Sequence, residues 1–485
     1  MRSILRPTLV LMSGRCVAFA ATFLIPVILV RIFDQASFGT YKQVFLVYST
    51  LFVLAQFGMA ESLFYFLPHN PHSGGRLTVN ALLTLGAAGI LCAAGLTAGA
   101  GLIARLMGNP SVAAFLPALG VYLALSLVAV SLEITMVAKE RFLLAACSFA
   151  ISEAVRAAMF LIPVVISGKL QWLLIGAIAF GLIRVMAIGV FLSREYPGEL
   201  RPDRNLFRGQ LAYVLPFELA ILIDTLQMNF HQYAVSYHFD VATFAIYSVG
   251  CLQIPASEFL AGPASNVMMV RMAEELREQH PQNAFEVWDE TVRKLILILV
   301  PLTGILIVCG RDLIVLLFTK AYTASVPIFM LWALVTALQA FPTDAALRVY
   351  ADTRTILKLN IIRFLFVVFG IGFALTRFGL VGPVLITIGA AALAKLMALF
   401  RIAKLAKVDF RHVISWKLAA FATSSALISM LTTVLARNHF HVSPIAGLFT
   451  SAFIYSASWS AMLLGRWLWK VRVMKPCAEL PESSV

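Results

Sequence analysis

Residues 170–193 read LQWLLIGAIAFGLIRVMAIGVFLS, and a single charged residue, Arg184, interrupts this apolar run. A helix that crosses a bilayer needs about 20 mainly apolar residues, so this stretch is long enough to span one. Similar stretches precede and follow it along the whole chain. We therefore predict an all-α polytopic membrane protein with about 14 transmembrane helices, at residues 8–30, 44–66, 79–104, 113–137, 143–167, 170–193, 211–235, 243–268, 295–310, 322–345, 359–376, 379–400, 416–436 and 443–465.

The composition supports this class of protein. Of the 485 residues, 60% are hydrophobic and only 13% are charged, whereas soluble proteins average roughly 45–50% and about 25%. The charged residues are too few to cover the surface of a soluble chain this long, which excludes a cytosolic enzyme, a disordered scaffold and a secreted disulfide-rich domain. The six cysteines show no CxxC or metal-binding spacing, so we predict neither a metal site nor a disulfide framework.

The net charge of +14 reflects topology and not nucleic-acid binding, because the basic residues lie between apolar runs and form no stripe. With the N-terminus inside, cytoplasmic segments hold 25 of the 38 Lys and Arg residues, and outside loops hold eight. This asymmetry predicts that both termini are cytoplasmic. Arg15 interrupts the first apolar run, so we expect an uncleaved first helix in place of a signal peptide.

The predicted loops are too short to contain a catalytic domain. The outside loops are short, and the chain has no GxxxxGK[ST] motif, so we predict a protein that is not an enzyme and has no catalytic residues. Among cytoplasmic segments, 271–294 is the longest; Pro281 divides it into two short pieces that we expect on the membrane surface, with either a connecting or a regulatory role. Leu313–Phe318, after the ninth helix, is expected to dip back into the interface.

An internal repeat divides the chain. Phe33-Asp34-x-Ala36-x-Phe38-x-x-Tyr41 recurs as Phe239-Asp240-x-Ala242-x-Phe244-x-x-Tyr247, in each case after the first helix of a six-helix group. Both of those helices start inside, so the repeat is parallel. We predict an N-lobe, a cytoplasmic linker, a C-lobe facing the N-lobe around a cavity, and two C-terminal helices with a cytoplasmic tail, at residues 1–193, 194–210, 211–400 and 401–485.

Three segments resemble a known family. Arg31-Ile-Phe-Asp-Gln-Ala-Ser-Phe-Gly39-Thr-Tyr41-Lys-Gln looks like the loop after helix 1 of bacterial polysaccharide transporters, and Gly58-Met-Ala-Glu-Ser62-Leu-Phe-Tyr-Phe-Leu-Pro68 looks like the end of their helix 2. Leu317-Phe318-Thr-Lys-Ala-Tyr322-Thr-Ala324 is similar to the turn before their helix 10. These proteins are oligosaccharide-lipid (O-antigen type) flippases of the multidrug/oligosaccharidyl-lipid/polysaccharide exporter superfamily.

The resemblance implies a function. It implies a flippase in the bacterial cytoplasmic (inner) membrane that moves a polyprenyl-pyrophosphate-linked oligosaccharide to the outer leaflet by alternating access, for cell-surface polysaccharide such as lipopolysaccharide or exopolysaccharide. The implied partners are this lipid-linked substrate, the bilayer and other polysaccharide-assembly membrane proteins, with no nucleic acid. It implies no cofactor beyond coupling to Na⁺ or H⁺. The several cavity arginines of the family's lipid II branch cannot be matched here position by position.

Charged residues deep in the predicted spans are candidate functional residues, because each costs at least ~2.5–3.5 kcal/mol at mid-bilayer. Arginine meets phosphate oxygens with a fixed fork of donors, so we predict that Arg15, Arg156 and Arg184 bind substrate. Glu153 lies three residues before Arg156 and can neutralise it. Asp224 and Glu258 lie near prolines whose freed carbonyls suit a cation; we assign Glu153, Asp224 and Glu258 to ion coupling or charge pairing.

Other features have simpler explanations. Five charges near predicted cytoplasmic helix ends are expected to snorkel to the surface: Glu61, Glu133, Asp344, Arg363 and Lys395. Gly95-x-x-x-Gly99 predicts close helix packing. Two rival functions stay open: an ion-coupled small-molecule (multidrug-type) antiporter of the same superfamily, which would want an acidic cavity, and a membrane glycan polymerase or ligase, which the short outside loops disfavour.

Overall fold

The computed structural model describes residues 5–438 and 443–473; within these ranges, the side chains of 5–17, 71, 216, 217, 219, 220, 255, 256, 258 and 469–473 are outside the described set. Every regular element in the described ranges is a helix. Ten of the described helices are long and apolar enough to cross a membrane, and Ala18–Ile32 and Val241–Gly250 are shorter apolar helices. The all-α polytopic membrane class is confirmed, and the exact number of fourteen spans stays a prediction.

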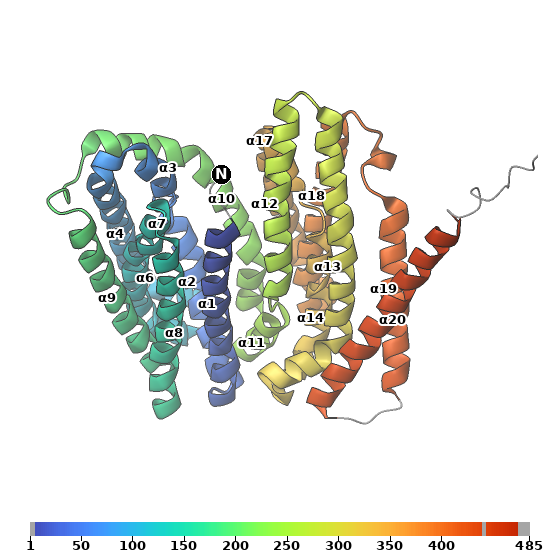
Figure 1. Ribbon diagram of the computed structural model, residues 1–485. Coiled ribbons are helices and arrows are strands. Elements are labelled where there is room, and N and C mark those ends of the chain that lie inside the picture. Colours follow the sequence, from blue (N-terminus) through green and yellow to red (C-terminus); the bar gives the residue numbers. More distant parts are fainter. Residues whose placement is uncertain (1–4, 439–442, 474–485) are drawn as a thin grey trace, which may run out of the picture. The chain divides into compact units, whose positions relative to one another are not determined.

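Contacts divide the chain into two compact units after Ser248, with the short segment Val367–Ile371 grouped with the first unit. This division does not fall at the predicted linker, residues 194–210. The predicted lobe boundaries stay a prediction. In the first unit, α4, α6, α8 and α9 run side by side (Figure 1). Its helices are α1 (Leu5–Ile32), α2 (Gln35–Gln56), α3 (Ser62–His69), α4 (Gly74–Ala98), α5 (Ala100–Leu106), η2 (Pro110–Ala114), α6 (Leu116–Ala129), α7 (Ser131–Ala138), α8 (Phe142–Ser167), α9 (Leu170–Glu195), α10 (Arg204–His238) and most of α11 (Val241–Gly250).

Small residues bring α4 and α6 into close contact. A Cβ added to Gly89 on α4 would lie 2.6 Å from the Cα of Ala124, and one added to Gly120 on α6 would lie 2.7 Å from the Cα of Ala93. Each helix therefore contributes a Gly-x-x-x-Ala pair that lets the backbones approach. The expectation of close packing at Gly95 was wrong, because a Cβ there would meet nothing within 4 Å.

The two copies of the sequence repeat have the same local structure. Asp34 caps α2 by accepting a hydrogen bond from Ser37 N at 2.8 Å, and Asp240 precedes α11 and accepts from Ala242 N at 3.1 Å. The pKa of both carboxyl groups is lowered, chiefly by the side-chain hydroxyl groups of Ser37 and Thr243 respectively and further by the backbone bonds. The repeated motif is thus a helix N-cap at each position.

A buried hydrogen-bond cluster joins α2 to α10 within the first unit. The side chain of Gln43 on α2 is fully buried; its Nε2 donates to Met107 O at 2.9 Å and to Ser236 Oγ on α10 at 2.8 Å. Its Oε1 accepts from Asn109 Nδ2 at 2.7 Å, and the same nitrogen donates to Thr40 Oγ1 at 2.9 Å. We call these residues the Gln43 cluster.

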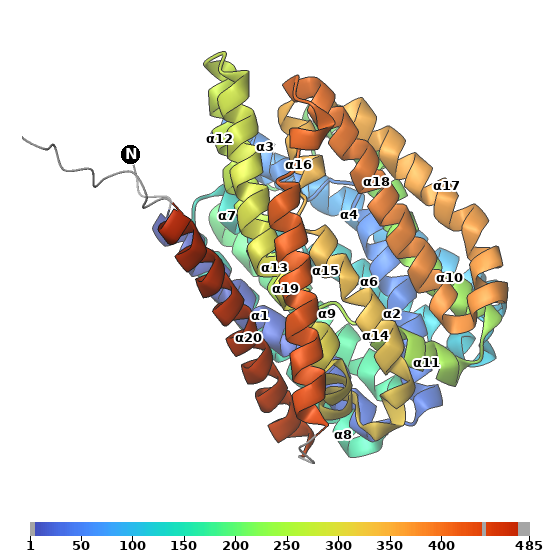
Figure 2. The ribbon, with the colours of Figure 1, turned by 90° about the vertical axis from the view of Figure 1, so that its right-hand side faces the viewer.

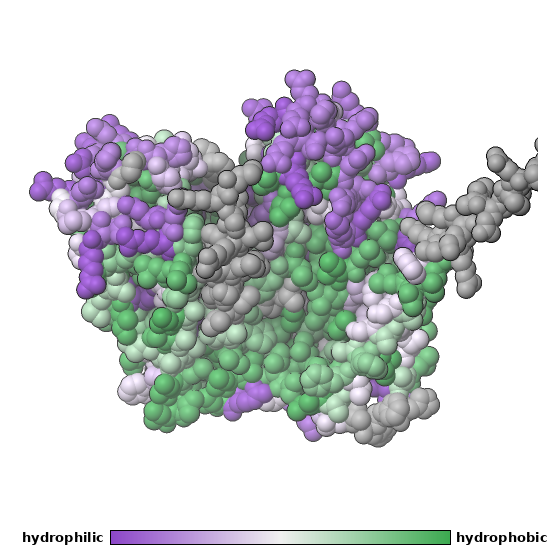
Figure 3. All heavy atoms as spheres, in the orientation of Figure 1, coloured by the Kyte–Doolittle hydropathy of each residue, from purple (hydrophilic) through white to green (hydrophobic). Residues whose placement is uncertain are grey.

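The second unit is built around α13, which packs against α12, α19 and α20 (Figure 2). Hydrophobic side chains cover the sides of these helices, whereas hydrophilic ones gather at the turn between α12 and α13 (Figure 3). The described helices of this unit are α12 (Pro255–Arg277), α13 (Pro281–Phe318), η3 (Lys320–Ser325), α14 (Val326–Trp332), α15 (Leu334–Leu338), α16 (Thr343–Val349), α17 (Thr353–Phe378), η4 (Gly379–Val381), α18 (Gly382–Ala406), η5 (Phe410–His412), α19 (Trp416–Arg437) and α20 (Pro444–Val473).

Two expectations about this unit were wrong. Residues 271–294 do not form short surface pieces, because α12 continues to Arg277 and α13 starts again at Pro281 after a three-residue turn. Proline is tolerated in the first turn of a helix, where its missing N–H has no partner to lose. Leu313–Phe318 does not dip back either, since it is the last part of the same continuous helix, α13.

Candidate functional site

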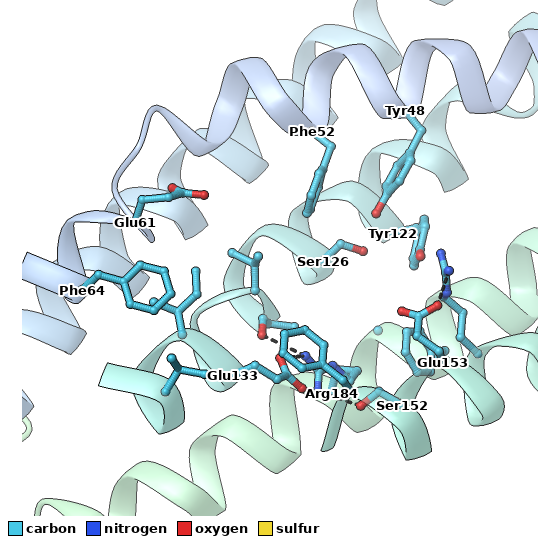
Figure 4. A pocket seen from close by; sticks show the side chains of 18 residues that line it. Tyr48, Phe52, Glu61, Phe64, Tyr122, Ser126, Glu133, Ser152, Glu153 and Arg184 are labelled. Atoms are coloured by element: carbon cyan, nitrogen blue, oxygen red, sulfur yellow. Dashed lines mark hydrogen bonds and ion pairs between the residues drawn. The ribbon is translucent and has the colours of Figure 1, made fainter. Parts of the chain in front are cut away.

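A pocket of about 520 Å³ lies inside the first unit. Its lining comes from α2, α3, α6, α7, α8 and α9 together with Glu61, which precedes α3. Figure 4 shows two kinds of wall: Tyr48 and Phe52 reach in from α2, and Glu133, Ser152 and Arg184 lie opposite them. Two of the three arginines predicted to bind substrate, Arg156 and Arg184, line this pocket.

Arg184 on α9 is held by Glu133 on α7. Its Nη1 donates to Glu133 Oε1 and its Nη2 to Glu133 Oε2, both at 2.6 Å. Nη1 also donates to Ser152 Oγ at 2.9 Å, and Nη2 to Ala129 O at 3.2 Å. This is the two-pronged geometry in which a guanidinium group binds a carboxylate or a phosphate. The carboxylate therefore occupies the contacts that an anionic ligand would use.

Glu133 was expected to snorkel to the membrane surface, and that expectation was wrong. The residue is only 3% exposed, and Ser148 Oγ on α8 donates to its Oε1 at 2.6 Å. A buried carboxylate needs a counter-charge, and Arg184 supplies it. The partner was missed because no residue of the same helix provides one, and a single sequence does not reveal pairs between helices.

Arg156 and Glu153 form the ion pair that their spacing on α8 predicted. Thr22 on α1 completes the group: its Oγ1 donates to Glu153 Oε2 at 2.8 Å and accepts from Arg156 Nη2 at 2.7 Å. The guanidinium carbon of Arg156 lies 5.8 Å from the centre of the Phe160 ring. Both guanidinium groups of the pocket thus have a carboxylate partner and a hydroxyl partner.

The remaining predicted site residues lie elsewhere. The side chains of Arg15 and Glu258 are outside the described residues, although Arg15 stands on α1 two helical turns before Thr22. Asp224 lies on α10, half-buried, and does not line this pocket. Their roles stay predictions.

The pocket lining contains one charged residue in addition to the two arginines and their two carboxylate partners. Glu61 also lines it, so the described lining contains three carboxylates and two guanidinium groups. Among the described lining residues, the formal charge is therefore −1. Glu61, like Glu133, had been expected only to snorkel.

Lys395, a half-buried charged residue of the other unit, contacts a backbone carbonyl. Lys395 on α18 was expected to snorkel, yet its Nζ donates to Phe341 O at 2.7 Å. Phe341 lies in the break between α15 and α16, just before Pro342. The same oxygen accepts from Thr343 N at 2.8 Å; the snorkelling of Lys395 stays a prediction.

Comparison with known proteins identifies the family. The family described as "Polysaccharide biosynthesis protein" matches residues 28–327, which is more than half of the chain.

The chain belongs to this polysaccharide biosynthesis protein family.

Among curated proteins, none is significantly similar to this member of the family. Among solved structures, the lipid II flippase MurJ in an inward closed conformation has a TM-score of 0.68 at 13% identity, covering 93% of this chain and 99% of the other. An inward-facing multidrug resistance transporter of the MATE family, in the MOP superfamily, has a TM-score of 0.59 at 15% identity, covering 80% and 96%. A MOP-superfamily transporter from Pyrococcus furiosus, whose title describes a binding pocket of reverse polarity, has a TM-score of 0.56 at 15% identity, covering 83% and 96%. At these identities the likeness shows a shared fold.

Proposed function

We propose that the protein is a flippase, which carries a polyprenyl-pyrophosphate-linked oligosaccharide from the cytoplasmic to the outer leaflet for cell-surface polysaccharide biosynthesis. The proposal places the protein in a bacterial inner membrane with both termini in the cytoplasm. The family supports a role in polysaccharide biosynthesis, and the fold is shared with a lipid II flippase.

One observation carries the proposal: Arg156 and Arg184, on neighbouring helices, line one pocket, and each is held by a carboxylate. A pyrophosphate group can replace those carboxylates on the guanidinium forks, because arginine binds both kinds of oxygen in the same geometry. When the anion leaves, Glu153 and Glu133 neutralise the arginines again. The pocket can therefore bind an anion and still release it.

The proposed cycle is alternating access between two lobes. The headgroup enters the pocket from the cytoplasm while the polyprenyl tail stays in the lipid. Moving one charge through 100 mV is worth ~2.3 kcal/mol, so a negative interior favours export of two negative charges by roughly 4–5 kcal/mol. Na⁺ or H⁺ binding, for which Asp224 and Glu258 are the candidates, then resets the empty carrier.

Ligand binding to the purified protein in nanodiscs tests the proposal. We expect the wild type to bind undecaprenyl pyrophosphate, and Arg156→Gln and Arg184→Gln each to weaken binding about tenfold or more, which corresponds to at least ~1.4 kcal/mol. Arg76→Gln is the matched control, since Arg76 is an exposed arginine of the same unit whose ion pair with Asp203 lies outside the pocket. If the wild-type protein does not bind this lipid, the proposal is wrong.

The second candidate is an ion-coupled small-molecule antiporter. It is favoured by the formal charge of −1 among the described pocket residues and by the likeness to MATE transporters. Binding of tetraphenylphosphonium that Glu61→Gln weakens, together with no binding of undecaprenyl pyrophosphate, would support it. A glycan polymerase or ligase is disfavoured by the short predicted outside loops, and chain extension by the purified protein would be needed to support that function.

A further inference from the structure

The wall opposite Arg184 is aromatic (Figure 4). Tyr48 and Phe52 lie four residues apart on α2, and Tyr122 and Ser126 lie four residues apart on α6. Residues with this spacing share one face of a helix, and all four line the pocket. Two neighbouring helix faces therefore contribute three aromatic rings and three side-chain hydroxyl groups, those of Tyr48, Tyr122 and Ser126.

The three rings form a stack. The Tyr48 and Tyr122 rings lie 4.9 Å apart with an angle of 19° between their planes, and the Tyr48 and Phe52 rings lie 5.5 Å apart at 22°. Tyr122 is almost fully buried, so it anchors the stack, and Figure 4 shows Phe52 at the opposite end. The side chain of Ser126 lies close to the Tyr48 hydroxyl (Figure 4). The stack is thus a fixed surface that ends in an apolar ring and has hydroxyl groups at its edge.

This combination suits a sugar ring. The faces of a gluco-configured pyranose carry only C–H groups, because its hydroxyl groups are equatorial. C–H groups with partial positive charge pack favourably on the electron-rich face of an aromatic ring, while the equatorial hydroxyl groups need partners at the edge. Phe52 offers the aromatic face, and Tyr48 and Ser126 offer the hydroxyl partners.

We propose that Phe52, Tyr48 and Ser126 bind the sugar that is directly attached to the pyrophosphate, a subsite that rests on the proposed flippase function. The pyrophosphate then lies toward Arg184, which is opposite Phe52 and Tyr48 (Figure 4), and toward Arg156, which lines the same pocket. In this arrangement the two arginines bind the pyrophosphate, which all such lipids share. The aromatic wall binds the sugar and so distinguishes a glycosylated lipid from the bare carrier.

The test compares two probes on the purified protein in nanodiscs: undecaprenyl pyrophosphate, and the same lipid bearing one N-acetylglucosamine. We expect the wild type to bind the glycosylated lipid about tenfold more tightly, a ratio equivalent to ~1.4 kcal/mol. Phe52→Leu, which keeps an apolar side chain but removes the ring, should abolish this preference and leave the affinity for the bare lipid unchanged.

Phe66→Leu is the matched control. Phe66 lies on α3 of the same unit, is half-buried like Phe52 and packs against Tyr65 and Tyr213, outside the pocket lining, so this variant should keep the preference. Equal weakening of both probes by Phe52→Leu, or no weakening of either, would overturn the subsite while leaving the flippase proposal intact. A wild-type protein that binds neither lipid would overturn both proposals.

Discussion

Glu133 and Arg184 show how a membrane-embedded charge is accommodated in this protein. Their side chains are 5% and 13% exposed, so neither can rely on water for solvation. Two parallel hydrogen bonds join the pair. In addition, Ser148 donates a hydrogen bond to Glu133, and Arg184 donates one to Ser152. Removing one member leaves the other as an uncompensated buried charge, which is more costly than removing both.

The first prediction concerns this pair. Arg184→Gln should lower the free energy of unfolding by about 3–5 kcal/mol, and Arg184→Gln combined with Glu133→Gln should recover most of that loss while remaining inactive in flipping. Thermal unfolding of the detergent-solubilised variants measures stability, and cell-surface glycan measures transport. A double variant that is stable and fully active would show that the pair is only structural.

The second prediction concerns Arg15, whose role was inferred from its depth in the first predicted span. Arg15→Ala should abolish glycan export without reducing the amount of protein in the membrane, and Arg15→Lys should retain part of the activity because it keeps the charge but not the fork. Immunoblots of membranes and staining of surface glycan are the two measurements. Normal glycan export by the Arg15→Ala variant would show that Arg15 is not part of the substrate-binding site.

The contents of the site could be only partly predicted from the sequence. Glu153 and Arg156 are three residues apart, so their pairing follows from helix geometry alone. Glu133 and Arg184 are separated by 51 residues, and the depth of Glu133 in its predicted span pointed to the surface. The aromatic wall could not be found either, since aromatic residues at helical spacing are common in apolar helices and show a pocket only once two helices are placed.

Among the elements, α4 and α6 depend on their small residues. At the Gly89–Ala124 and Gly120–Ala93 contacts the backbones leave no room for a larger side chain. The same motif at Gly95 has open space around it. A small-x-x-x-small pattern therefore predicts that helices approach closely, but the face of the helix decides which copy of the pattern is used.

The third prediction follows from this contact. Gly120→Leu should separate α4 from α6 and destabilise the protein by about 1–3 kcal/mol, the usual cost of overpacking. Gly95→Leu should be close to neutral, because Gly95 is exposed and an added Cβ would meet nothing within 4 Å. Melting temperatures of both variants in one detergent make the comparison, and equal destabilisation would contradict the assigned packing.

The Gln43 cluster holds α2, the turn at Met107–Asn109 and α10 together. Gln43→Leu, the fourth prediction, should leave Asn109 and Ser236 without their amide partner and lower the free energy of unfolding by about 1–3 kcal/mol. Ser49→Ala on the same helix is the control, because Ser49 is exposed and its hydroxyl donates only to Leu46 O within the helix. Thermal unfolding of both variants checks the prediction; a melting temperature of Gln43→Leu equal to that of the wild type would contradict it.

At the scale of the whole molecule, the sequence predicted the helices better than their connections. Each predicted span coincides with one helix or with consecutive helices, because long apolar runs between polar turns are a strong signal. The connection at Pro281 was misjudged since proline at the start of a helix and proline between two surface segments look alike in a sequence. The lobe boundary depends on which helices pack together, and hydropathy carries no such information.

The fifth prediction tests the topology. In a variant without the six native cysteines, a single cysteine at Gln279 should react with a membrane-impermeant maleimide only in inverted vesicles, and one at Arg377 should react only in intact spheroplasts. These positions lie in the turn between α12 and α13 and at the end of α17, which the excess of cytoplasmic Lys and Arg places on opposite sides. Labelling of both from the same side would contradict the predicted orientation.

The paired arginines have a consequence for selectivity against ordinary solutes of the cytoplasm. Inorganic phosphate and free nucleotides carry the same phosphate oxygens as a lipid pyrophosphate. They would therefore occupy a pocket whose guanidinium groups had no carboxylate partner. Here such a solute has to dislodge an internal carboxylate first, and it has no isoprenoid chain in the bilayer to hold it nearby while it does so. For the proposed flippase, the empty state therefore stays available for the lipid-linked substrate in the presence of competing phosphates.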